Sequence, residues 1–109
     1  MNPPGHGSLG APVEAFVRLI SGRHKADVVI ALGKAGRLRF TELRRSIPGV
    51  SDRALARQLR ALEQDGIVAR RVFAEVPPRV EYRLTPRGAT LCPLLKQIWK
   101  WGSRHGGVV

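Results

Sequence analysis

Residues 40–65, FTELRRSIPGVSDRALARQLRALEQD, limit the fold more than any other stretch of this chain. Apolar residues at positions 40, 43 and 47 recur at helical spacing, and Pro48-Gly49 then interrupts the helix. Ser51 or Asp52 can cap a second helix, because either side chain can accept a hydrogen bond from an unpaired first-turn N–H group. The stretch therefore predicts a short helix, a turn and a longer helix.

The longer helix has two chemically different faces at about 100° per residue. One face is a leucine stripe formed by Leu55, Leu59 and Leu62. The opposite face is an arginine row formed by Arg53, Arg57 and Arg60, with Gln64 extending it. Such a helix can lie in the major groove of DNA, because the leucines hold it on its domain while the arginines reach phosphates and base edges. The alternative is the ordinary solvated face of a surface helix.

The charge of the chain favours a polyanionic partner, either nucleic acid or an anionic membrane surface. Nineteen Lys and Arg residues against eight Asp and Glu give a net charge of +11, with a pI near 11.6. Between Lys34 and Arg87 there are thirteen basic and six acidic residues, so +7 falls within the regularly patterned part. Fifteen of the nineteen cations are Arg, which suits bidentate contacts with phosphate or guanine. This distribution favours a shaped DNA-binding surface over a disordered basic arm.

The hydrophobic pattern predicts no membrane association. No apolar run approaches the roughly 18 residues that a membrane span requires. The N-terminal residues lack the basic and apolar regions of a signal peptide, so we expect a cytoplasmic protein associated with the nucleoid.

After Gly66 the apolar spacing changes from helical to alternating, which predicts two β-strands. The first covers residues 67–73 and the second residues 80–84, and the loop between them contains Pro77 and Pro78. Two strands joined by a stiff loop directly after a DNA-reading helix are typical of a winged helix-turn-helix. We expect Arg79 in this loop to reach the minor groove, since Arg suits its narrow, electronegative floor. The alternative for Arg79 is an exposed hairpin tip.

The predicted fold class is mainly α with a small β-hairpin (α+β), a winged helix-turn-helix in residues 12–105. Flexible segments, 1–11 and 106–109, flank it. The helices at 12–22 and 86–103 are too apolar for a small monomer to bury, so we expect them to form a homodimer interface. Pro93 should bend the second of them. The expected interface residues are Val13, Phe16, Val17, Ile20, Leu94, Leu95, Ile98, Trp99 and Trp101. The alternative is that both helices pack on their own domain.

The expected partner is double-stranded DNA, and its contacts divide into two groups. Arg53, Ala54, Arg57 and Gln58 should lie in or beside the major groove. Lys34, Arg39, Ser51 and Arg60 should hold phosphates, while Arg79 anchors the wing.

Three sequence strings in this order resemble the HxlR-type family of bacterial winged-helix regulators, which are relatives of the MarR type. They are Arg39-Phe40-Thr41-Glu42-Leu43, Pro48-Gly49-Val50-Ser51 and Glu75-Val76-Pro77-Pro78-Arg79-Val80-Glu81-Tyr82. The resemblance covers roughly residues 11–103. It implies a homodimeric transcription factor that binds a pseudo-palindromic operator, often as a repressor.

The chain departs from this family at two positions. Many members carry an oxidant-sensing cysteine just before Pro-Val-Glu, where this chain has Ala11, and many have Gly-Lys-Trp where it has Gly22-Arg23-His24. Cys92, the only thiol, is either an inert packing residue or a sensor that forms an intersubunit disulfide or is modified. His24 is either a plain polar helix-start residue or a pH- or ligand-responsive group. The resemblance leaves open whether a small-molecule effector binds between the dimerising helices and the DNA-binding part.

A second function class is a sequence-indifferent nucleoid-type or RNA-binding protein that depends on charge alone. Catalysis is not expected, because the sequence shows no paired-carboxylate cleft, Ser/His/Asp set, glycine-rich phosphate loop or metal-ligand cluster. We therefore predict no enzymatic activity and no cofactor.

Overall fold

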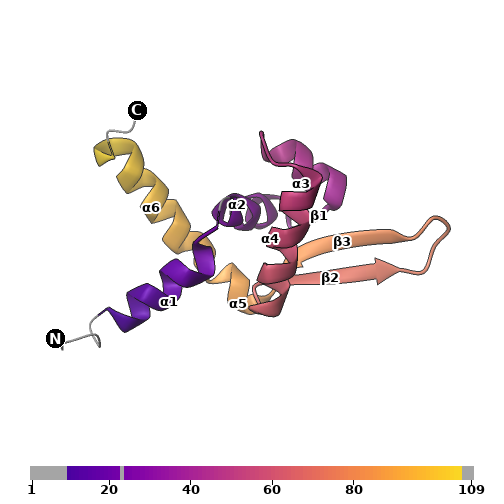
Figure 1. Cartoon of the computed structure of the whole chain (residues 1–109), viewed down its shortest axis with the longest axis horizontal. Coiled ribbons are helices and arrows are strands. Elements are labelled where there is room, and N and C mark those ends of the chain that lie inside the picture. The colour runs from indigo at the N-terminus through magenta and orange to yellow at the C-terminus, as the bar shows by residue number, and fades with distance from the viewer. Residues whose placement is uncertain (1–9, 23, 107–109) are drawn as a thin grey trace.

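The computed structural model describes residues 10–22 and 24–106, and it confirms the mainly helical fold with a small antiparallel sheet (Figure 1). The predicted flexible segments lie largely outside these residues. The elements in chain order are α1 (Ala11–Ile20), α2 (Lys25–Ala35), β1 (Arg37–Arg39), α3 (Phe40–Ser46), α4 (Asp52–Gln64), β2 (Val68–Phe73), β3 (Arg79–Leu84), α5 (Pro86–Ala89) and α6 (Leu91–His105).

The helix-turn-helix is formed by α3, the turn after it, and α4. Gly49 adopts a φ of +82° in this turn, a conformation that glycine accepts without strain. Ser51 is the N-cap of α4, since its Oγ accepts a hydrogen bond from the Ala54 N–H at 3.1 Å. Asp52 instead forms an ion pair with Arg44 at 2.9 Å, which ties the start of α4 to α3. The structure thus selects one of the two predicted caps.

The sheet has three antiparallel strands in the order β1-β3-β2. The hairpin of β2 and β3 runs in register from Val68 opposite Leu84 to Phe73 opposite Arg79. β1 pairs with β3 through Arg37 opposite Arg83 and, two residues further on, Arg39 opposite Glu81. The sequence predicted two of these strands, at residues 67–73 and 80–84, and did not predict β1 as a third.

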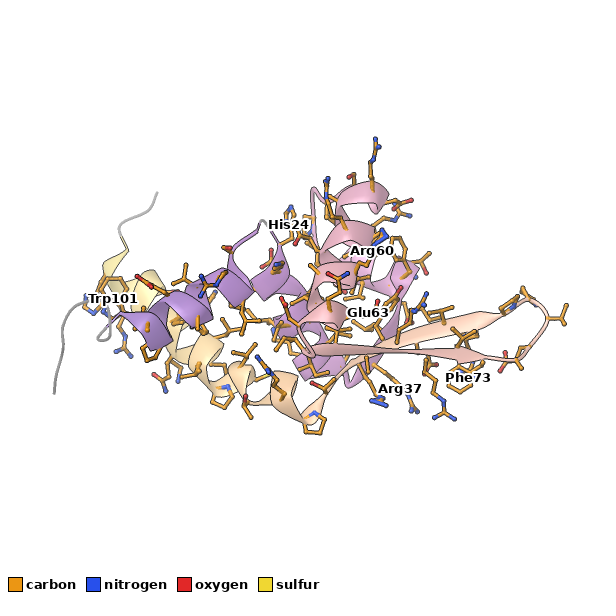
Figure 2. The ribbon with its side chains drawn as sticks, turned by 60° about the horizontal axis from the view of Figure 1, so that its bottom comes forward. His24, Arg37, Arg60, Glu63, Phe73 and Trp101 are labelled. Atoms are coloured by element: carbon orange, nitrogen blue, oxygen red, sulfur yellow. The ribbon has the colours of Figure 1, made fainter. Side chains whose placement is uncertain are left out.

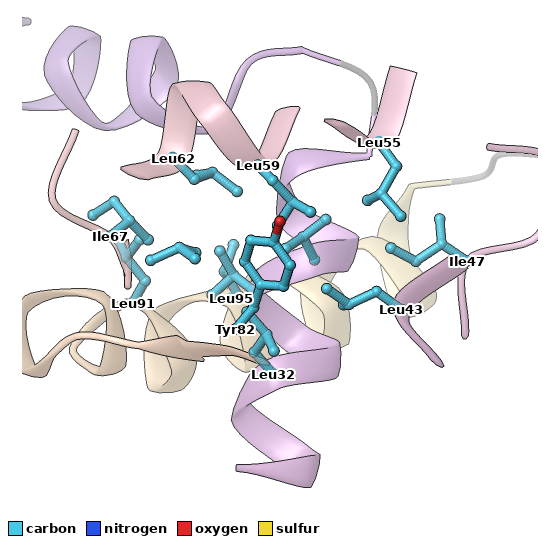
Figure 3. Packing of buried hydrophobic residues seen from close by; sticks show 13 residues of the cluster. Leu32, Leu43, Ile47, Leu55, Leu59, Leu62, Ile67, Tyr82, Leu91 and Leu95 are labelled. Atoms are coloured by element: carbon cyan, nitrogen blue, oxygen red, sulfur yellow. The ribbon is translucent and has the colours of Figure 1, made fainter. Parts of the chain in front are cut away.

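The core lies between the inner face of the sheet and helices α2, α3, α4 and α6. Figure 3 shows Tyr82 of β3 facing the leucines of α4 across this core. Burial raises the pKa of the Tyr82 phenol by penalising its charged form. The buried apolar residues are Val28, Val29, Leu32, Leu43, Ile47, Leu55, Leu59, Leu62, Ile67, Val68, Tyr82, Leu91 and Leu95. Because all three leucines of the predicted stripe are buried, the arginine row must face solvent.

The C-terminal part is two helices rather than the single bent helix predicted from Pro93. The break lies at Thr90, and Pro93 occupies the first turn of α6. Pro93 has no N–H to donate to the Ala89 carbonyl, so α5 cannot continue smoothly into α6. A first helical turn tolerates proline because its N–H groups have no partner within the helix.

Helices α1 and α6 extend away from the sheet and diverge from each other, opposite the hairpin (Figure 1). Their outer apolar side chains are exposed: Val13 61%, Val17 53%, Leu94 52%, Ile98 51%, Trp99 66% and Trp101 64%. Phe16 and Ile20 are partly buried against the core. Leu95 is a correction to the predicted interface, because it is only 4% exposed and belongs to the core of its own chain. No helix in the described parts of the chain has the length and apolar character to cross a membrane.

Candidate nucleic-acid interface

The arginine row of α4 is exposed along its whole length, as the sequence predicted. Arg53, Arg57 and Arg60 lie on the face opposite the buried leucines, and Gln64 is exposed at its end. Among the described residues none of these three guanidiniums forms a salt bridge. Their hydrogen-bond donors are therefore available to phosphates or to base edges.

Ala54 and Gln58, also expected at the major groove, lie on the flank of α4 and are partly buried. Gln58 reaches toward the turn between α1 and α2, where a Cβ added to Gly22 would stand 3.2 Å from its Oε1. The structure therefore does not bring Gln58 into the arginine row. Ser51 stands at the N-terminus of α4; its oxygen accepts the capping hydrogen bond, and its hydroxyl hydrogen can still be donated.

Lys34 and Arg39 are exposed but separate from the row. Lys34 lines an open groove of about 470 Å³ between α2 and the end of α3, together with Asp27, Ile30 and Pro48. The backbone N–H of Arg39 donates to Glu42 Oε1 at 2.7 Å and so caps α3. The strand register places the Arg39 side chain on the sheet face that points away from the core.

Arg79 lies outside the loop that joins the two strands, which corrects its predicted place in that loop, while its minor-groove contact stays a prediction. It begins β3, and its guanidinium contacts Glu75 at 2.7 Å, Glu81 at 2.6 Å and the Phe73 ring at 3.8 Å from the centroid. The hydrogen bond from Arg79 lowers the pKa of Glu75, and the same bond raises the pKa of Arg79. The tip is formed by apolar residues, with Val76 fully exposed. The carboxylates four residues before and two after Arg79 were a signal of this pairing that the sequence analysis missed.

The two expected sensor residues occupy different helix junctions. Cys92 is partly buried, and its Sγ lies 2.7 Å from the position of a Cβ added to Gly33, so it packs α6 directly on α2. His24 starts α2 with a φ of +77°, and its Nδ1 lies 3.4 Å from Asp27 Oδ2. Within the described residues no three His, Cys, Asp or Glu side chains are grouped to hold a metal ion.

Comparison with known proteins gives a consistent result. A family model described as HxlR-like helix-turn-helix matches residues 19–108. An uncharacterized HTH-type transcriptional regulator of Methanothermobacter thermautotrophicus is 46% identical over 94 residues, which cover 86% of this chain and 71% of that protein.

Solved structures agree with the sequence comparisons. The redox regulator HypR in its reduced form has a TM-score of 0.82 and 43% identity, covering 88% of this chain and 94% of that one. A regulator assigned to the MarR family, from Porphyromonas gingivalis W83, has a TM-score of 0.83 and 30% identity, covering 95% and 99%. These relatives are DNA-binding transcriptional regulators rather than enzymes. This chain belongs to the HxlR-like helix-turn-helix family of transcriptional regulators.

Proposed function

We propose that this regulator is a homodimer that binds a pseudo-palindromic operator sequence-specifically and represses the genes beside it. The observation that carries the proposal is the arginine row of α4, which is exposed, free of carboxylate partners among the described residues and backed by buried leucines. We expect it to act in the cytoplasm, bound to the DNA of the nucleoid.

In this proposal α4 lies in the major groove. Arg57, at the centre of the row, reads a base edge, and Arg53 lies beside it nearer the start of the helix. Arg60 and Ser51 hold phosphates on either side. The hairpin lies along the neighbouring backbone, and Arg79 anchors the wing by fixing its shape through Glu75 and Glu81.

The exposed apolar side chains of α1 and α6 support a dimer. Six large apolar side chains on these two helices are more than half exposed, and a second copy of the same surface can cover them. Two recognition helices separated by about one DNA turn, roughly 34–36 Å, would then read two half-sites.

The signal that releases this regulator from DNA does not act through a cysteine just before Pro12, because that position is Ala11. Although the similar protein HypR is described as a redox regulator, the partly buried Cys92 packs against Gly33 where α6 meets α2. We therefore assign Cys92 a packing role. We assign His24 the role of a polar residue that starts α2.

Selection of bound fragments from the organism's own genomic DNA tests the proposal. A specific regulator enriches one or a few sites that share an inverted repeat. Repeating the selection with oxidants or candidate metabolites identifies conditions that release it. Uniform recovery of all fragments would instead support the sequence-indifferent alternative, which the net charge of +11 alone could produce.

A further inference from the structure

The outer face of the sheet carries a second group of arginines that the proposed operator contact does not use. Leu38, Val80 and Tyr82 point into the core, so the alternate strand positions point outward. The strand register places Arg83 beside Arg37, Glu81 beside Arg71, and Arg79 beside Phe73 on that side. The register also places Arg39 beside Glu81 on this side. We call these residues the outer sheet face: Arg37, Arg39, Arg71, Phe73, Arg79, Glu81 and Arg83.

This face is on the opposite side of the domain from the arginine row. The leucines of α4 and the inner face of the sheet meet across the core, so their two outer surfaces point apart. Figure 2 shows Arg37 and Phe73 on one side of the hairpin and Arg60 of α4 on the other. A straight duplex with α4 in its major groove therefore does not cover the outer sheet face.

The charges of this face are only partly neutralised. Glu81 accepts a hydrogen bond from Arg79 at 2.6 Å and lies 3.8 Å from Arg37. Arg71 stacks on the Phe73 ring at 4.6 Å, and neither Arg71 nor Arg83 has a salt-bridge partner within the described parts of the chain. Five arginines, Arg39 included, surround one carboxylate on this face, which leaves it cationic even after the Glu75 pairing of Arg79.

The shape of the face favours an extended polyanion over a small ligand. The hollow between Arg37, Arg71, Phe73, Glu81 and Arg83 holds only about 30 Å³, roughly the volume of one water molecule. A phosphate oxygen fits this space, whereas a drug-sized molecule does not. Guanidiniums bind phosphate oxygens in a bidentate way, and a flat sheet can present several of them to consecutive phosphates.

We propose that the outer sheet face binds the sugar–phosphate backbone of a second DNA segment, so that a regulator seated on its operator bridges two segments. The inference rests on the proposed function for the first segment. DNA is favoured over an acidic protein because neighbouring DNA is already at high effective concentration around an operator-bound dimer. The contact carries no base information, so it should be sequence-independent and sensitive to salt.

A capture experiment tests this proposal. Operator duplex fixed on beads is saturated with the full chain, and a labelled duplex without an operator is then added at several salt concentrations. The test variant is Arg71→Ser with Arg83→Ser, because removing these two guanidiniums leaves no carboxylate without its ion-pair partner. The matched control is Arg87→Ser with Arg104→Ser, which removes two exposed charges elsewhere. Thermal unfolding verifies that both variants fold.

We expect wild type and the control double variant to capture equal amounts of the second duplex. The test double variant should capture about tenfold less, or lower still. Operator affinity of the test double variant should stay within about twofold of wild type. The proposal is overturned if wild type holds operator but captures no second duplex, or if both double variants lose capture equally. It is also overturned if the two test substitutions weaken operator binding as much as they weaken capture of the second duplex. Capture of polyglutamate in place of DNA would overturn it as well.

Failure of the proposed function gives a different result. If no operator exists, the same capture is run with two unrelated duplexes. Bridging that depends on Arg71 and Arg83 would then support the outer sheet face while rejecting sequence specificity. Absence of any duplex binding would reject both proposals.

Discussion

Arg57 lies in the middle of the exposed row on α4, with Arg53 one turn before it and Arg60 about one turn after it. Other arginines already form ion pairs within the chain: Arg44 pairs with Asp52, and Arg79 pairs with two glutamates. At the scale of single residues, what separates a DNA contact from a structural arginine is whether a carboxylate already occupies its guanidinium. Sequence spacing could have signalled the pairing of Arg79, whose glutamates are two and four residues away, but not that of Arg44, whose partner Asp52 lies beyond the turn.

Replacing Arg57 with Ala should weaken operator binding by about 1–3 kcal/mol and relax the preference at one base position. Replacing Arg60 with Ala should weaken binding to all sequences alike and reduce the salt slope by about one, because a phosphate contact is lost. Titrations against operator variants at several salt concentrations distinguish the two. Wild-type affinity in both variants would show that this face does not contact DNA.

Gly88 lies so close to the Ile67 backbone that a Cβ there would stand 2.1 Å from the Ile67 carbonyl oxygen. Backbone cannot move aside as a flexible side chain can, so Gly88→Ala should destabilise the fold by about 3 kcal/mol. Gly102→Ala is the matched control, since a Cβ there meets nothing within 4 Å and the helix gains up to roughly 1 kcal/mol. Denaturant unfolding measures both variants. Equal stability of the two would contradict the packing of α5.

At the scale of elements, the contact between α2 and α6 depends on the close approach of Gly33 and Cys92. Gly33→Ala raises helix propensity by up to roughly 1 kcal/mol, but its Cβ would stand 2.7 Å from the Cys92 Sγ. We therefore expect Gly33→Ala to be stabilising only when Cys92 is also changed to Ala. The unfolding free energies of wild type, the two single variants and the double variant form a double-mutant cycle, which measures the coupling between Gly33 and Cys92. Additive effects would show that the sulfur does not pack on Gly33.

The wing should loosen in acid. The pKa of Glu75 is lowered by its hydrogen bond from Arg79, so the ion pair is fully present above the usual carboxyl value near 4.5. It is lost as the pH falls through the lowered folded value, because protonation removes the charge that Arg79 binds. NMR should show the Phe73 ring and Arg79 side-chain signals shifting together in this range. The same shift in Glu75→Gln would assign the change to another group.

Helical and alternating periodicity predicted most elements, because each pattern depends on residues close together in sequence. The leucine stripe of α4 and the hairpin strands are examples. Features set by strand register or by distant packing were missed or misplaced. β1 as a third strand and the outer sheet face both depend on which residues lie opposite each other across strands. Likewise, only the packed structure shows that Leu95 is buried while Leu94 is exposed. The contact of Arg79 with Glu81, two residues away on the same strand, was a local signal that was missed.

At the scale of the whole molecule, the helices that we propose to pair lie at a different end from the hairpin. The molecule measures 55 × 30 × 23 Å, with α1 and α6 at one end of the long axis and the hairpin at the other (Figure 1). Pairing through the helical end would leave both α4 helices and both hairpins free, which fits the proposed reading of two half-sites.

Trp99→Glu should therefore dissociate the dimer, weakening it by on the order of 2 kcal/mol or more, because a charge would be buried in place of an apolar anchor. Trp99 is 66% exposed in the single chain. Val72→Glu is the matched control, since Val72 is 58% exposed but lies on the hairpin. Sedimentation equilibrium should give monomer for the first variant and dimer for the second. Unchanged dimers in both would place the interface elsewhere.

The central claim is that this regulator reads DNA sequence through α4 rather than binding by charge alone. Its most direct test is the ratio of the dissociation constants for an enriched operator and for a scrambled duplex of equal length, measured at physiological salt. We predict a ratio of about 10³ or more for wild type, and a clear fall for Arg57→Ala. A wild-type ratio near one, unchanged by Arg57→Ala, would contradict the account.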